Sequence, residues 1–193
     1  LQLAGARFLR VDGRAIGPVS AAMKAAVERV AQRLAQAGAR VEDLDCDGRL
    51  ARLVELHRTI MAHEAARNMA AEAGRPDLIS PAFAELVATG RATGFADYLA
   101  ARSEVARHAA WLSSRMQGTA GLLAPAAPDS APAGLDATGS PHMSRPWQVL
   151  GLPAATWPAA TDADGMPLGV QLIGRRWGDA AMLEFAGQIA LMD

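Results

Sequence analysis

The stretch that decides the fold is Gly165-Met-Pro-Leu-Gly-Val-Gln-Leu-Ile-Gly174, which reads as a loop leading into a buried strand. Val170, Leu172 and Ile173 can bury against helices, whereas Gln171 needs hydrogen-bond partners if it is enclosed. A second strand is predicted at 154–157, and the connecting loop contains Asp162-Ala-Asp-Gly165. We therefore predict that the two strands form an antiparallel pair.

The beginning of the chain resembles a strand–helix–strand unit. A short strand is predicted at 6–11, and a helix after Pro18 carries its apolar residues at steps of three and four until Gly38 ends it. A second strand is predicted at 40–44, and a short buried strand at 121–125. These strands can join the pair at 154–173 in one sheet.

Helices are predicted in the middle and at the end of the chain. Apolar periodicity indicates helices at 50–72, 81–90, 95–116 and 179–191, the last with Asp179 as its N-cap. Residues 128–146 are dense in proline, glycine, serine and aspartate, which is typical of a loop. The prediction is one domain over residues 1–193, an α/β fold with a mixed β-sheet and helices on both faces.

Composition excludes several classes of protein. Apolar residues make up 51% of the chain and charged residues 20%, with a net charge of −1, so neither nucleic acid nor an anionic membrane is expected as a partner. Cys46 is the single cysteine, which excludes an intrachain disulfide and favours a reducing, cytoplasmic location. No secretory signal precedes the first strand, and because the chain begins at Leu1 we expect further residues upstream.

Several motifs in the last third are similar to the closing motifs of the amidase-signature family. They are Leu122-Leu-Ala-Pro125, Asp136-Ala-Thr-Gly139, Trp147-Gln-Val-Leu-Gly-Leu-Pro153 and the stretch Gly165–Gly174. The helical middle, with His57-Arg58, Glu64, Asn68 and Phe95-Ala-Asp-Tyr98, also resembles that family. The resemblance implies the carboxy-terminal part of an amidase-signature α/β/α fold.

Members of that family hydrolyse amide bonds with a serine nucleophile, a second serine and a lysine base. In the family these residues lie upstream of the part matched here, in a stretch rich in glycine and serine, and this chain has no such stretch. The one adjacent serine pair, Ser113-Ser114, falls within a predicted helix, and Lys24 reads as a solvated helix residue. The expectation is therefore a scaffold without catalytic residues, inactive in amide hydrolysis on its own.

The resemblance places a loop beside the substrate of the intact enzyme. Thr138, Gly139, Ser140 and His142 would contact the substrate there, and Trp147 would bound an apolar acyl group. The alternative is a surface loop without ligand contact. His57, Glu64 and Asn68 share one side of a predicted helix and pose a similar choice between a buried polar network and a site.

Other chemistries lack their motifs. The spacing of His57 and His63 does not match a zinc-protease helix, no glycine loop suits a phosphate, and Cys46 has no activating neighbour. No metal or cofactor is expected.

Two alternatives to a hydrolase part remain, a non-catalytic binding or assembly domain and one subunit of a tRNA-dependent amidotransferase. The second is weaker because 138–147 lacks an acidic residue to meet an ammonium group. The expected partner is a small amide in the intact enzyme, and exposed strand edges and an apolar face favour a homodimer.

Overall fold

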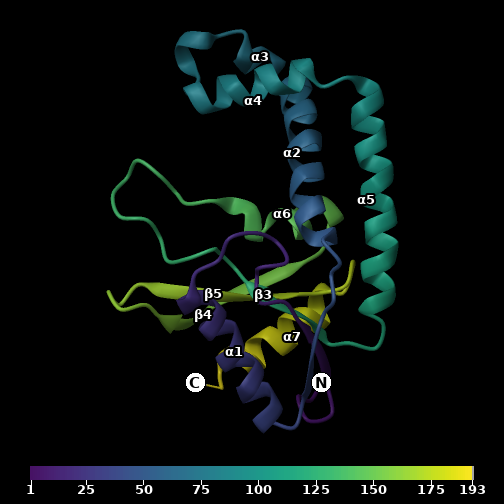
Figure 1. Cartoon of the computed structure of the whole chain (residues 1–193), viewed down its shortest axis with the longest axis vertical. Coiled ribbons are helices and arrows are strands. Elements are labelled where there is room, and N and C mark those ends of the chain that lie inside the picture. Colours follow the sequence, from purple (N-terminus) through teal and green to yellow (C-terminus); the bar gives the residue numbers. More distant parts are fainter. Residues whose placement is uncertain (193) are drawn as a thin grey trace.

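The computed structural model describes residues 1–192 and contains a five-stranded mixed sheet (Figure 1). The strand order across the sheet is β2-β1-β3-β5-β4. The strands are β1 (Arg7–Arg10), β2 (Arg40–Asp43), β3 (Gly121–Pro125), β4 (Ala154–Thr161) and β5 (Pro167–Ile173). β1 runs parallel to β2 and to β3, while β5 runs antiparallel to β3 and to β4. The predicted antiparallel pair at the end of the chain is thus confirmed.

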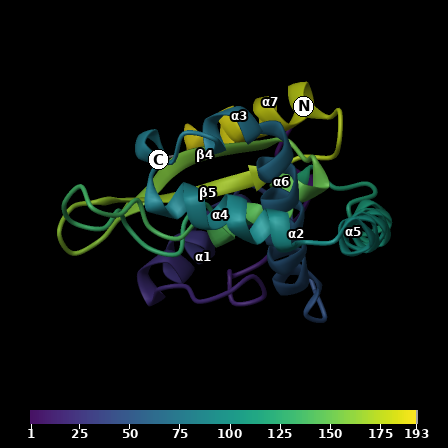
Figure 2. The same cartoon turned by 90° about the horizontal axis from the view of Figure 1, so that it is seen from above.

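Helices cover both faces of the sheet, as predicted. They are α1 (Ala21–Gln36), α2 (Arg49–Asn68), α3 (Ala70–Ala73), α4 (Pro81–Ala92), α5 (Phe95–Arg115), α6 (Arg145–Leu150) and α7 (Asp179–Ala190). α1 and α7 lie against one face, and α2 and α6 lie against the other (Figures 1 and 2). α2 and α5 extend away from the sheet, and the segment with α3 and α4 joins their far ends (Figure 1).

Alternation along the strands divides the core into two layers. Leu9 and Leu122 point to the layer beneath α2, α5 and α6, whereas Phe8 and Leu123 point to the layer beneath α1 and α7. Successive side chains of a strand face opposite sides of the sheet, so one apolar run can supply both layers. This arrangement explains why β3 is buried at every position.

Helix boundaries differ from the predictions at three places. The predicted helix at 50–72 divides at Met69, where α2 ends and the short α3 follows. Within the predicted loop at 128–146, α6 begins at Arg145, and Pro146 is tolerated in its first turn because the N–H that proline lacks would have no intrahelical partner there. The N-cap of α7 is Gly178 and not Asp179, because the turn closed by the Gly178 N–H and the Arg175 carbonyl makes Asp179 the first helical residue.

No helix within residues 1–192 has both the length and the apolar character needed to cross a bilayer.

Candidate functional site

The carboxyl ends of β1 and β3 form a topological switch point. From β1 the chain passes through α1 to β2 on one side, while β3 pairs with β1 on the other side. Ligands of open α/β sheets bind preferentially outside such a point, where the loops diverge. The two loops that leave here are joined, because the Ser20 N–H donates to the Pro128 carbonyl across 2.9 Å.

A cavity of about 220 Å³ opens beside this point. Its walls come from residues 126–132, 138–140 and the start of β5 at Pro167 and Gly169. Three of the predicted substrate-binding residues, Thr138, Gly139 and Ser140, lie together in this wall. Gly139 has a φ of +79°, a backbone conformation that favours glycine, which suits the tight course of the loop.

His142 lies beneath the cavity wall and is 8% exposed. Its Nε2 is 2.8 Å from the Pro18 carbonyl oxygen, and its Nδ1 is 2.8 Å from Ser140 Oγ. A carbonyl can only accept, so Nε2 carries the hydrogen in the neutral ring and the Ser140 hydroxyl donates to Nδ1. His142 therefore orients Ser140 and does not itself line the cavity.

Trp147 lies elsewhere. It is 2% exposed and packs into the core layer beneath α2 and α5. Its indole Nε1 is buried and has no hydrogen-bond partner among residues 1–192. The structure thus gives Trp147 a packing position and does not bring it to the cavity with Thr138, Gly139 and Ser140.

Two polar residues of the cavity wall were missed by the sequence analysis. Asp129 and Ser130 follow Pro128, and both line the cavity. A hydrogen bond from Ser130 is the largest cause of the lowered pKa of Asp162, which lies in the loop between β4 and β5, and the Met166 N–H adds a second. The sequence signal that could have identified these two residues is their position as a polar pair directly after the proline-rich end of β3.

Gln171 fixes the floor of this region. It is 4% exposed, and its Nε2 donates to the carbonyl oxygens of Pro125 at 2.8 Å and Met143 at 3.2 Å. The expectation that an enclosed Gln171 needs partners is confirmed. One side chain on β5 thereby ties the end of β3 to the segment that carries His142.

His57, Glu64 and Asn68 line a separate groove of about 570 Å³ that also includes residues of α5 and α6. Glu64 belongs to a polar network, because the Tyr98 hydroxyl donates to Glu64 Oε1 at 2.8 Å and Arg102 donates to the same hydroxyl at 2.7 Å. Burial, and secondarily the charge of Arg145, lowers the pKa of His57. The structure therefore shows a partly exposed polar network at Glu64, and a binding role for the groove stays a prediction.

Comparison with known proteins finds amidases and related proteins that match parts of this chain. The family model described as Amidase matches residues 122–183, the segment that contains the whole cavity wall. A fatty acid amide hydrolase of Oryza sativa subsp. indica is 54% identical over 41 residues, which are 21% of this chain and 7% of that protein. One component of the glutamyl-tRNA(Gln) amidotransferase of Neisseria meningitidis is 42% identical over 77 residues, 36% of this chain and 16% of that protein.

Residues 122–183 of this chain therefore match the amidase family.

The amidase fold extends over the whole chain. A crystal structure of an amidase superposes with a TM-score of 0.85 at 24% sequence identity, and the superposition covers 99% of this chain and 46% of that one. The five-stranded sheet with helices on both faces is thus the amidase-signature fold. The chain spans less than half the length of these relatives.

In this chain with the amidase fold, the lysine and the paired serines lie on different helices. Lys24 is half-buried on α1 and lines a cavity of about 550 Å³ with Arg10 and Glu28. Ser113 is exposed on α5, and the Ser114 hydroxyl donates to the Trp111 carbonyl at 2.7 Å. No hydrogen bond joins the amine of Lys24 to a serine side chain within residues 1–192. No activated hydroxyl is formed by these groups.

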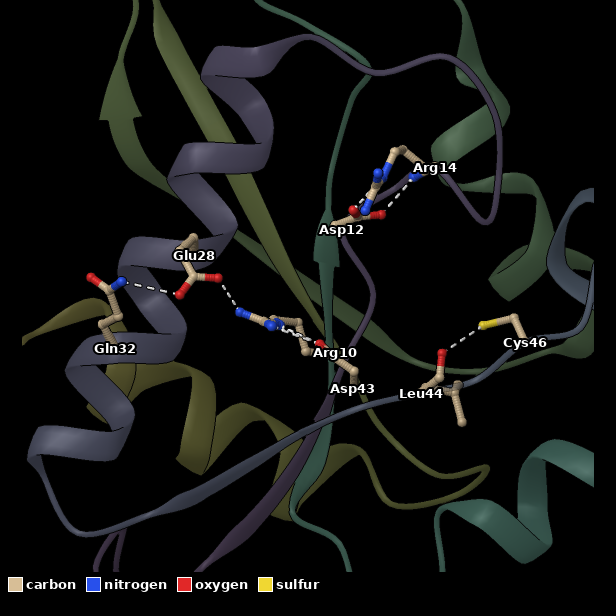
Figure 3. A network of polar contacts seen from close by, with 8 residues as sticks. All are labelled: Arg10, Asp12, Arg14, Glu28, Gln32, Asp43, Leu44 and Cys46. Atoms are coloured by element: carbon tan, nitrogen blue, oxygen red, sulfur yellow. Dashed lines mark hydrogen bonds and ion pairs between the residues drawn. The ribbon is translucent and has the colours of Figure 1, made fainter.

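The charged groups that line this cavity together with Lys24 are paired with one another. Figure 3 draws these pairs. Arg10 lies between Glu28 and Asp43, and the hydrogen bond from Arg10 lowers the pKa of Asp43. Asp12 accepts from Arg14 in the same region. These pairs satisfy the charges at the carboxyl ends of β1 and β2 without a ligand. Nowhere in the part of the chain that the structure describes do three or more His, Cys, Asp or Glu side chains gather as metal ligands.

Proposed function

We propose that this chain forms the carboxy-terminal part of the fold of an amide-bond hydrolase and supplies one wall of its substrate pocket. In this proposal the hydrolytic serine and lysine come from polypeptide outside residues 1–193. The single observation that carries it is the cavity in which Thr138, Gly139 and Ser140 meet at the switch point of the sheet. The match of the family model to residues 122–183 supports it, since that segment builds the cavity.

The chemistry of the wall suits a small amide. The Thr138 hydroxyl can donate to an amide carbonyl or accept from an amide N–H, and the Ser140 hydroxyl can accept from an amide N–H. Ser140 is held by His142, so its hydrogen already points to Nδ1 and its oxygen is free to accept. A fixed acceptor of this kind orients a substrate without taking part in bond cleavage.

Two measurements test the proposal. In nuclear magnetic resonance titrations with benzamide and hexanamide, we expect shifts centred on the amides of 126–132 and 138–140, and we expect Ser140→Ala to reduce them. Ser103→Ala, an exposed change on α5, serves as the matched control. Shifts confined to another region would contradict the assignment of the pocket wall.

Catalytic competence is tested separately. A fluorophosphonate labels activated serine hydroxyls, and we expect it to leave the chain unlabelled while a serine hydrolase in the same tube reacts. Turnover of these amides above the buffer rate, or labelling of Ser113 or Ser114, would overturn the assignment of a scaffold role.

A second candidate is an amidotransferase component, and Asp129 is the observation that favours it. The loop 138–147 has no acidic residue, but the structure brings the Asp129 carboxylate into the same cavity wall. A carboxylate there can meet the ammonium group of glutamine. The 42% identity to the component of the Neisseria meningitidis glutamyl-tRNA(Gln) amidotransferase supports this candidate.

The two candidates differ in the ligand they favour. Glutamine titration should shift the cavity amides in an amidotransferase component, and Asp129→Asn should abolish the shift. In a hydrolase part for uncharged amides, benzamide should bind and glutamine should not. The Asp136→Asn change, also in an exposed loop position, controls for the loss of one charge.

We propose in addition that the chain forms a homodimer. β2 and β4 are the two edges of the sheet, and edge strands offer unpaired backbone groups to a second copy. Sedimentation velocity at several concentrations tests this, and a monomer at every concentration would contradict it.

A further inference from the structure

A cavity of about 150 Å³ opens at the opposite end of β5 from the candidate site, and we call it the second cavity of this strand. It is lined on one side by α5 and on the other by the end of α6 and the turn after β5. Gly169 borders the first cavity and Arg175 borders the second. Six residues of extended chain separate them by roughly 20 Å. This cavity is therefore distinct from the proposed substrate pocket.

The interior of the second cavity is apolar. Ala109 and Leu112 of α5 and Met116, its C-cap, contribute one wall, and Leu150 and Leu152 contribute the other. Leu112 and Met116 are each 1% exposed, so these walls belong to the packed core and keep their shape. An apolar cavity of about 150 Å³ is large enough to hold one benzene ring.

Two guanidinium groups border the same cavity. Arg175 and Arg176 line it, and neither makes an ion pair with a carboxylate within residues 1–192. Arg176 instead lies 5.4 Å from the centroid of the Trp177 ring, which is 86% exposed. Trp177 has a φ of +63°, a conformation that is unfavourable for a bulky residue. The turn thus holds an aromatic ring and two uncompensated positive charges beside an apolar opening.

We propose that this cavity is a binding site for a small aromatic carboxylate, with its ring between α5 and α6 and its carboxylate at Arg175 and Arg176. Charge complementarity selects this occupant, because the exposed guanidinium groups of Arg175 and Arg176 can pair with a carboxylate at the opening, whereas an aliphatic zwitterion would also bring a cation to them. Arginine binds carboxylates through two parallel hydrogen bonds, which gives orientation as well as attraction. The Trp177 ring extends the apolar surface at the opening.

The test compares three ligands on the unchanged chain. Benzoate carries the ring and the charge, benzamide carries the ring alone, and acetate carries the charge alone. We expect benzoate to bind this cavity roughly ten-fold more tightly than either of the others, a ratio equivalent to about 1.4 kcal/mol, when the affinities are read from nuclear magnetic resonance shifts of the amides of Ala109, Leu112 and Arg175 rather than from those of 126–132 and 138–140. Equal affinities for benzoate and benzamide would overturn the role of the arginines, and equal affinities for benzoate and acetate would overturn the role of the cavity.

Variants separate the two halves of the site. Arg175→Gln with Arg176→Gln should remove the preference for benzoate over benzamide, while Arg75→Gln with Arg91→Gln changes the net charge equally at exposed positions and should preserve it. Ala109→Leu fills the cavity and should abolish benzoate binding, whereas Ala110→Leu places the same side chain on the exposed side of α5. Unchanged benzoate binding by a folded Ala109→Leu chain contradicts the proposal. If a partner protein occupies the opening instead, benzoate fails to bind the unchanged chain, and the proposal is wrong.

Discussion

The Nε2 of His142 lies 2.8 Å from the carbonyl oxygen of Pro18, a residue 124 positions earlier in the sequence. The same ring packs so closely on Gly17 that a Cβ at that glycine would lie 2.8 Å from His142 Cδ2. One imidazole therefore joins the loop after β1 to the segment before α6. The wall of the candidate site depends on this contact, because the other ring nitrogen holds Ser140.

The contact gives a first prediction. His142→Ala removes the partner of a buried carbonyl, which should lower the free energy of unfolding by about 1–3 kcal/mol. Urea denaturation followed by circular dichroism measures this loss. Ser113→Ala, at an exposed position of α5, should leave the midpoint unchanged. An unaltered stability of the His142 variant would show that the two loops are held together by other contacts.

The second prediction concerns the crossing of α2 and α4. A Cβ at Gly90 would lie 1.8 Å from the Ala62 carbonyl oxygen, so Gly90→Ala must push the helices apart. We expect a loss of about 1–3 kcal/mol, typical of overpacking. In contrast, a Cβ at Gly187 on α7 meets nothing within 4 Å. Gly187→Ala should therefore stabilise the chain by about 0.5–1 kcal/mol. Thermal unfolding of both variants checks the opposite signs, and equal effects would contradict the close approach.

Acid should weaken the contact between α2 and α5. Arg52 donates to both carboxylate oxygens of Glu104, at 2.8 and 2.9 Å, and these hydrogen bonds lower the pKa of Glu104 to about 2. Because the pKa of Glu104 is lower in the folded state than in the unfolded state, the pair stabilises the fold at any pH above the unfolded-state pKa. This stability is lost as the pH falls from the unfolded-state pKa toward the folded-state pKa. We expect a loss of about 1 kcal/mol between about pH 5 and pH 2, since the pair is partly exposed.

The matched variants for this window are Glu104→Gln and Glu72→Gln. Glu104→Gln should flatten the pH dependence of the unfolding free energy between about pH 5 and pH 2, whereas Glu72→Gln, on exposed α3, should keep it. Parallel curves for the unchanged chain and Glu104→Gln would show that the pair contributes nothing measurable.

The fourth prediction concerns the thiol of Cys46. The side chain is 4% exposed, and burial together with the charges of Asp45 and Asp12 raises its pKa to about 12. Only the thiolate is nucleophilic, so iodoacetamide should react with the folded chain far more slowly than with the chain in urea. Mass spectrometry follows the reaction, and Cys46→Ser shows the background. Rapid labelling of the folded chain would contradict the buried position.

The local pattern of residues determined most of the secondary structure and the layered fold. Helical and strand periodicities are set by neighbours along the chain, so the strands at 6–11, 40–44 and 121–125 and the helices that cover them could be predicted. The need of Gln171 for partners also followed from its place in an apolar run. The family resemblance located the loop of Thr138, Gly139 and Ser140.

Only the tertiary structure decided how these parts meet. The polar pair after Pro128 marked Asp129 as a candidate, but its meeting with Thr138 in one cavity wall depends on loop conformation and therefore on contacts with distant segments such as Pro18. Trp147 was expected beside a substrate, yet the amphipathic turn of α6 directs its ring into the core. Whether a side chain is buried depends on which helices and strands pack against it. A local sequence pattern does not specify that packing.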